Sequence, residues 1–136
     1  MSWDILVQDM PADAKAIADI PHDFRPEPLG PRSELISRIQ ALVPEADFSD
    51  PSWGLIDGPG FSIEVSFGKL ETVTGFSFHV RGGDAAAGVV TEILTGLGLR
   101  AFDTTTGEFF DSAQAVESLR KWRAYRDRFV GTNGAA

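Results

Sequence analysis

The residues of this chain whose types could do chemistry together are Glu64, His79 and Arg81. A carboxylate can orient an imidazole as a general base, and a nearby guanidinium can hold an anionic group. Glu64 and His79 are therefore the candidates for catalysis, and all three residues form the candidate set that binds a ligand or a partner. The alternative is an ordinary cross-strand charge pair on a solvated sheet face, which contributes little to stability. No neighbouring serine is distinguished as a nucleophile.

Two strands must position these side chains. Apolar and polar residues alternate in Phe61-Ser-Ile-Glu-Val-Ser-Phe67 and in Phe76-Ser-Phe-His-Val-Arg81, which is typical of strands with one buried face. The buried positions are odd-numbered in the first strand and even-numbered in the second, so the numbers of paired residues must add to an odd value. The connection of about eight residues favours a sum of 143. This register places Glu64 opposite His79 and Ser62 opposite Arg81, whereas a register slipped by two would place His79 opposite Ser62.

The remaining pattern predicts three helices and further strands. Apolar residues recur at helical spacing over residues 31–43, 84–97 and 111–130. We expect Pro31 in the first helical position, Asp84 as an N-cap, and Gly98 and Gly131 as helix ends. Further strands are expected at residues 3–7, 53–56, 99–103 and 108–110.

These elements predict an α+β fold. We expect a mostly antiparallel sheet of about five or six strands, with two or three helices packed on one face. Residues 76–103 should form one βαβ unit, whose strands run parallel if they share a sheet. The length fits a single domain over residues 1–131, followed by a disordered tail at 132–136.

Two connections are less regular. Residues 11–31 contain five prolines and should be mostly extended, as an ordered belt over a sheet edge or as a functional segment. The loop between the two central strands, residues 68–75, is expected to be exposed.

The composition gives little support for a bound cofactor or metal ion. The chain has no cysteine and only two histidines, which argues against a typical zinc site. The acidic loop around Asp47 and Asp50, and the turn after Asp103, fit capping and turn chemistry better than calcium ligation. The run from Arg81 to Asp84 could bind a phosphate at a helix start, but a turn with an N-cap explains it as well. We expect no cofactor.

The charge favours a protein partner over a nucleic acid. The net charge is −8, with −11 in residues 1–111 and +3 in residues 112–136. An acidic body repels a nucleic-acid backbone and allows a basic protein partner. The first residues do not resemble a signal peptide, and no apolar run reaches the roughly 20 residues of a membrane span, so we expect a cytoplasmic protein without membrane contact. A monomer and a homodimer are both compatible with the sequence.

Three runs carry a resemblance: Trp3-Asp-Ile-Leu-Val-Gln-Asp9, Phe78-His-Val-Arg-Gly-Gly83 and Thr106-Gly-Glu-Phe-Phe-Asp111. Together they resemble a family of small bacterial cytoplasmic proteins without an assigned activity. The resemblance implies no catalytic residues. Size and acidity are also similar to those of immunity proteins, which neutralise bacterial toxins. The function we expect is a non-enzymatic protein-interaction domain, an inhibitor of a basic partner being one form of it. The alternative is a small enzyme or ligand-binding protein that uses Glu64, His79 and Arg81.

Overall fold

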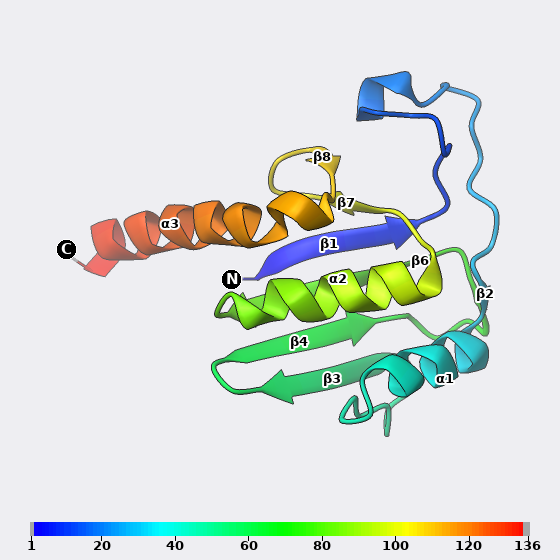
Figure 1. The fold of residues 1–136 in the computed structure, drawn as a ribbon, viewed down its shortest axis with the longest axis horizontal. Helices are drawn as coiled ribbons and strands as arrows, with labels where there is room; N and C mark the ends of the chain where they lie inside the picture. Colours follow the sequence, from blue (N-terminus) through cyan, green and yellow to red (C-terminus); the bar gives the residue numbers. More distant parts are fainter. Residues whose placement is uncertain (1, 135–136) are drawn as a thin grey trace.

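The computed structural model describes residues 2–134, and its centre is a six-stranded sheet in the order β3-β4-β6-β1-β7-β8 (Figure 1). Neighbouring strands pair antiparallel throughout. The α+β class is therefore confirmed, with six strands in the main sheet. The strands are β1 (Trp3–Gln8), β3 (Trp53–Gly58), β4 (Phe61–Ser66), β6 (Gly75–Gly82), β7 (Ala101–Asp103) and β8 (Glu108–Phe109).

The expected βαβ unit is β6, α2 (Ala85–Leu97) and β7. Both strands pair antiparallel with β1, so they run parallel to each other with β1 between them. The first strand of the chain thus enters the middle of the sheet. This insertion places residues of the N-terminus beside residues more than 70 positions later.

Three helices cover one face of the sheet: α1 (Arg32–Leu42), α2 and α3 (Ala115–Gly134) (Figure 1). The alternating strand residues of that face form the core with the apolar stripes of the helices. Trp3 and Phe78 are among its fully buried side chains. No helix of residues 2–134 covers the opposite face of β3, β4 and β6.

The register expected for the central hairpin is confirmed. Ile63 pairs with Val80, Glu64 with His79, and Ser62 with Arg81, each adding to 143. The rings of Phe67 and Phe76, just beyond the ladder, lie 4.7 Å apart between centroids. Parity of the buried positions and the length of the connection were sufficient to fix this pairing.

The last helix differs from the expectation in extent and in its buried stripe. A short 3-10 turn, Ser112–Gln114, precedes α3, and the helix continues through Gly131 to Gly134. A glycine costs only about 1 kcal/mol in a helix and does not by itself end it. Residues 132–134 are therefore helical and not the start of a tail, and residues 135–136 lie outside the described part.

Only part of the stripe expected on α3 is buried. Leu119 and Trp122 are buried, whereas Val116 and Tyr125 are 38% and 49% exposed. The helix extends past the end of the sheet (Figure 1), so its outer turns have no strand to cover them. The apolar stripe was longer than the surface available to bury it.

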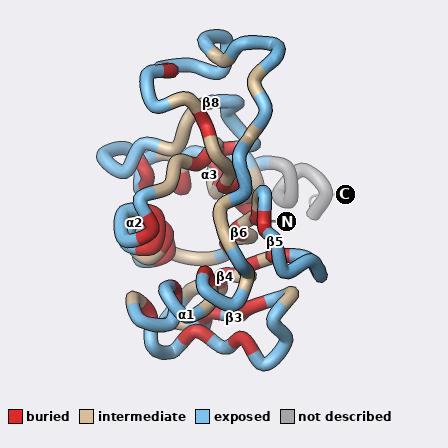
Figure 2. The backbone as a smooth tube through the Cα atoms, turned by 90° about the vertical axis from the view of Figure 1, so that its right-hand side faces the viewer, coloured by how far each residue is buried: buried red, intermediate tan, exposed pale blue. Residues whose placement is uncertain are grey.

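The segment from Pro11 to Leu29 crosses the ends of the strands (Figure 2). Its 3-10 turn, Ile17–Asp19, lies near the edge strand β8. Its last part leads into a second small sheet, in which β2 (Gly30–Pro31) pairs with β5 (Thr72–Val73). The exposed loop expected at residues 68–75 is thus wrong in part, because Val73 is buried. The apolar side chain of Val73 joins the core below the segment.

Two helix starts also differ from the expectation. Pro31 is the N-cap of α1 and not its first helical residue. Asp84 is the N-cap of α2, as expected, but its side chain makes no capping hydrogen bond. Its carboxylate instead accepts hydrogen bonds from two arginines of α3, with Arg120 donating to Oδ2 and Arg123 to Oδ1. Gly98 ends α2 in the left-handed conformation, as expected.

Candidate functional site

The helix-free face of the sheet presents its side chains in rows that follow the strand register. One row runs Trp53, Ser66, Ser77 and Leu6 across β3, β4, β6 and β1. The next row runs Leu55, Glu64, His79 and Asp4, and the third begins Asp57, Ser62 and Arg81. The three candidate residues therefore share one surface, which we call the open face.

Glu64 and His79 face each other in the ladder, but their side chains bind other groups. Glu64 Oε1 accepts a hydrogen bond of 3.1 Å from Arg81 Nη1, diagonally across β4 and β6. Both side chains are partly exposed, so the pair is worth well under 1 kcal/mol. We expected the carboxylate of Glu64 to bind the imidazole of His79, and this is wrong. The guanidinium of Arg81 binds Glu64, and a different acid binds the histidine.

That acid is Asp4. His79 Nδ1 lies 2.8 Å from Asp4 Oδ1, because Asp4 stands opposite His79 in the β1–β6 ladder. Ser2 Oγ donates to the same carboxylate oxygen. A carboxylate at Nδ1 leaves Nε2 directed elsewhere, which is how an imidazole is oriented for proton transfer or for binding.

Trp53 covers the histidine from the edge strand β3. Its ring centroid lies 5.5 Å from that of His79, and the ring planes are inclined by only 15°. Ser66, opposite Trp53, is small, so the indole can extend across β4 towards β6. Trp53 keeps 45% of its surface exposed and Leu55 keeps 37%. The open face thus has an apolar patch bordered by carboxylates.

Comparison with models of protein families and with curated protein sequences finds no match to this chain. The resemblance to small bacterial proteins of no assigned activity therefore stays a prediction. The function of the protein is therefore inferred from the geometry of its surfaces.

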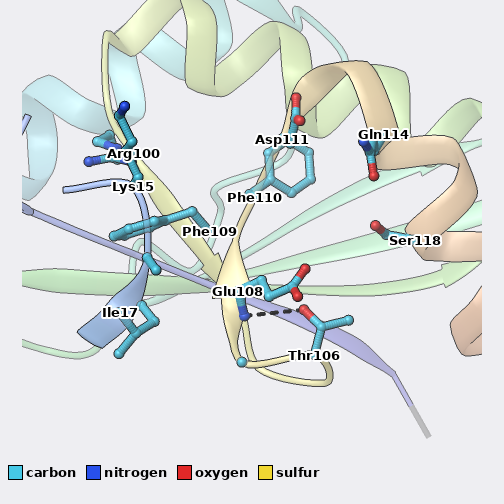
Figure 3. Close-up of a pocket in the computed structure, with 12 residues that line it drawn as sticks. Lys15, Ile17, Arg100, Thr106, Glu108, Phe109, Phe110, Asp111, Gln114 and Ser118 are labelled. Atoms are coloured by element: carbon cyan, nitrogen blue, oxygen red, sulfur yellow. Dashed lines mark hydrogen bonds between the residues drawn. The ribbon is translucent and has the colours of Figure 1, made fainter. Parts of the chain in front are cut away.

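A cavity lies away from the open-face candidates, at the β8 edge of the sheet (Figure 3). Its volume is about 490 Å³, and its lining comes from the first 3-10 turn, from β7–β8 and from the start of the last helix. Neither Glu64, His79 nor Arg81 lines it. The concave pocket that an enzyme would need around His79 is therefore not provided by this cavity.

The other sequence candidates take part in local structure. Asp47 and Asp50 accept hydrogen bonds from the hydroxyls and backbone N–H groups of Ser49 and Ser52, and these bonds lower the pKa of both carboxyls. The turn chemistry expected there is confirmed. Within residues 2–134 no group of three or more acidic or histidine side chains is placed to hold a metal ion.

The phosphate-binding alternative at the start of α2 is not supported by the side chains around it. Arg120 and Arg123 are engaged with Asp84, and Arg123 also donates to the backbone oxygen of Gly82. The carboxylate of Asp84 therefore already pairs with the two arginines that could otherwise attract an anion to this helix start.

The sequence did not reveal Asp4 and Trp53 as members of the site. Both stand at outward positions of their strands, and that much can be read from the alternation. Which strand lies beside which is decided by the strand order, and no local pattern specifies that β1 pairs with β6.

No helix of the described residues combines the length and the apolar character of a membrane span.

Proposed function

We propose that this protein is a non-enzymatic interaction domain of the bacterial cytoplasm, whose open face binds a basic protein, as an immunity-type inhibitor would. The observation that carries the proposal is the exposed Trp53, held flat against His79 at the centre of that face. Tryptophan is the side chain that most often dominates binding energy at protein interfaces. The stacking restrains the indole, so less conformational entropy is lost on binding.

The apolar patch has the layout of an interface centre. Trp53 and Leu55 are exposed side by side on β3, next to the Glu64 and Ser66 of β4. Interfaces commonly have such an apolar centre with a polar border. A partner that places an apolar side chain on Trp53 would bury this patch.

Charge favours a basic partner. The open face contributes three carboxylates, those of Asp4, Asp57 and Glu64, against the guanidinium of Arg81. Two cations of α3, Arg120 and Arg123, do not offset them, since both are paired with Asp84. Complementary charge accelerates association and makes it sensitive to salt.

The test uses two variants of the open face and two matched controls on the helix side. Tagged wild-type protein and variants would be presented to a lysate fraction enriched in basic proteins, and the retained proteins quantified. Trp53→Ala and Asp57→Lys should each reduce retention of one stoichiometric partner at least tenfold. Tyr125→Ala removes from α3 an aromatic side chain about as exposed as Trp53, and Glu92→Lys reverses an exposed charge on α2. Neither control should change retention of the partner. Equal losses in all four variants, or retention that rises with salt, would contradict the proposal.

A second candidate is general-base chemistry or ligand binding by His79. The contact between Asp4 and His79 Nδ1 favours it, since a carboxylate there is the usual means of orienting a basic imidazole. In this version Asp4 replaces Glu64 as the orienting acid, while Glu64 and Arg81 border the site. His79→Ala would abolish turnover or ligand binding in a metabolite screen, whereas an interaction domain would keep its fold and lose only partner affinity.

A further inference from the structure

The cavity at the β8 edge is large enough for a small molecule. Its volume of about 490 Å³ falls in the range of roughly 300–1,000 Å³ that is usual for ligand sites. The half-buried ring of Phe109 lies on the same side as Lys15, Arg100 and Ile17, as Figure 3 shows. The polar groups around this ring are arranged by charge.

One side of the cavity is basic. Figure 3 shows Arg100 and Lys15 together on this side, one from the start of β7 and the other from the first connection. The guanidinium of Arg100 is fixed by two contacts: Nη1 donates to the backbone oxygen of Pro11 at 2.6 Å, and the group lies 4.0 Å from the centre of the Phe109 ring. Four of its five N–H groups remain for a ligand, and their fork matches a carboxylate.

The other side of the cavity is acidic and polar. Asp111 enters it from the start of the last helical segment, together with Gln114 and Ser118, and Glu108 lies between the two sides (Figure 3). Asp111 Oδ1 accepts the N–H of Ala113, which holds the carboxylate in place and leaves Oδ2 for another donor. Two carboxylates and a hydroxyl are the groups that bind an ammonium.

The four charged side chains are not paired with one another. None of the ion pairs between residues of the described part includes Lys15, Arg100, Glu108 or Asp111. Two cations and two anions thus face a common space without neutralising each other directly. A molecule with charges of both signs could contact both sides at once, and its apolar part could lie on Phe109.

We propose that this cavity binds a small amino-carboxylate, namely a free amino acid or a short peptide with unblocked ends. The carboxylate would be held by Arg100 and Lys15, and the ammonium by Glu108 and Asp111. The site is separate from the open face and does not depend on the function proposed for that face.

The first experiment is a titration of the full chain, followed by backbone amide NMR, with four probes. Leucine and leucyl-leucine carry both charges, N-acetyl-leucine carries only the anion, and leucinamide carries only the cation. We expect saturable shifts around residues 106–111 with at least tenfold tighter binding of a zwitterion than of either blocked form. The stronger of leucine and the dipeptide identifies the free amino acid or the peptide as the ligand class. Equal affinities of the blocked and unblocked forms, or no saturable shift at millimolar concentration, would overturn the proposal.

Variants that each remove one charged side chain test which side of the cavity binds the carboxylate of the ligand and which side binds its ammonium. Lys15→Ala should weaken binding of the zwitterion and of N-acetyl-leucine by fivefold or more, while that of leucinamide stays unchanged. Asp111→Asn keeps an acceptor for the Ala113 N–H and should weaken the zwitterion and leucinamide instead. Lys121→Ala and Glu92→Gln, at exposed positions outside the cavity, should bind all probes like the wild type. Loss of affinity in these controls, or identical effects of both cavity variants on all probes, would contradict the assignment.

Discussion

The imidazole of His79 is bonded to Asp4, a residue 75 positions earlier, and not to Glu64, its partner on the other side of the ladder. Both acids stand directly opposite the histidine, one on each neighbouring strand. The two acids differ because Arg81 binds Glu64 and competes with His79 for its carboxylate, which is turned along the strands.

Two double-mutant cycles should reveal this preference. Asp4→Ala with His79→Ala should give a coupling of about 0.3–1 kcal/mol, the range for partly exposed charged pairs. Glu64→Ala with His79→Ala should give about zero. The measurement is urea unfolding at one fixed pH, with coupling taken from the four free energies of each cycle. A larger coupling in the Glu64 cycle would mean that the histidine changes partner in solution.

A second prediction concerns Asp103, which is 3% exposed on the core side of β7. Its Oδ2 accepts the indole N–H of Trp3 at 2.9 Å, and its Oδ1 accepts the backbone N–H of Thr105. Asp103→Ala would leave the buried indole N–H of Trp3 and the part-buried N–H of Thr105 without this acceptor. We expect a loss of about 2–4 kcal/mol of unfolding free energy, since each unsatisfied buried donor costs roughly 1–3 kcal/mol.

Asparagine at this position separates the two contacts. Asp103→Asn keeps one oxygen for the turn but cannot accept from both sides, so its loss should be smaller than that of alanine. Asp57→Ala on the exposed edge is the control and should change stability by less than about 0.5 kcal/mol. Equal stability of Asp103→Ala and Asp57→Ala in urea would show that the Trp3 contact is dispensable.

The third prediction concerns the acid sensitivity of the contact between α2 and α3. Hydrogen bonds from Arg120, opposed by partial desolvation and supported by Arg123, lower the pKa of Asp84 below its ordinary value of 3.8. The stabilisation is fully present above that ordinary value and is lost as the pH falls through the lower pKa of the folded state. Asp84→Asn should lower the melting temperature at pH 7 and reduce the further loss below pH 4.

The control for this pH profile is Glu92→Gln, which removes an exposed carboxylate from the middle of α2. Its melting temperature should follow that of the wild type between pH 2 and pH 7. Parallel pH profiles for Asp84→Asn and the wild type would show that the arginines do not stabilise the charged carboxylate.

The fourth prediction compares two glycines of α2. A Cβ added at Gly88 would meet no atom within 4 Å beyond the backbone of its own helix. Gly88→Ala should therefore stabilise the protein by about 0.5–1 kcal/mol, the helix-propensity difference. At Gly96 a Cβ would lie 2.5 Å from Leu42 Cδ1 of α1, so Gly96→Ala must displace that side chain.

We expect Gly96→Ala to gain less than Gly88→Ala, or to destabilise, when both are measured by thermal and urea unfolding. Packing of α1 against α2 opposes the gain in helix propensity at Gly96, and nothing opposes it at Gly88. A larger gain at Gly96 would show that Leu42 moves aside freely.

The local features of the fold could be predicted from the sequence. Alternation at period two placed β1, β4 and β6 and assigned their buried faces. The parity of those faces, together with the length of the connection, predicted the pairing of Glu64 with His79. Helical spacing placed α1 and α2, and the glycine at 98 ended α2. These features depend on neighbours within a few residues, or on one short connection, so a single stretch of sequence contains them.

Only the tertiary structure decided which distant side chains meet. The insertion of β1 between β6 and β7 brings Asp4 to His79, and the path of α3 brings Arg120 and Arg123 to Asp84. The cavity at β8 likewise joins residues from three separate segments. Strand order and helix placement minimise the free energy of the whole core, and many arrangements satisfy the same local patterns, so no periodicity specifies them.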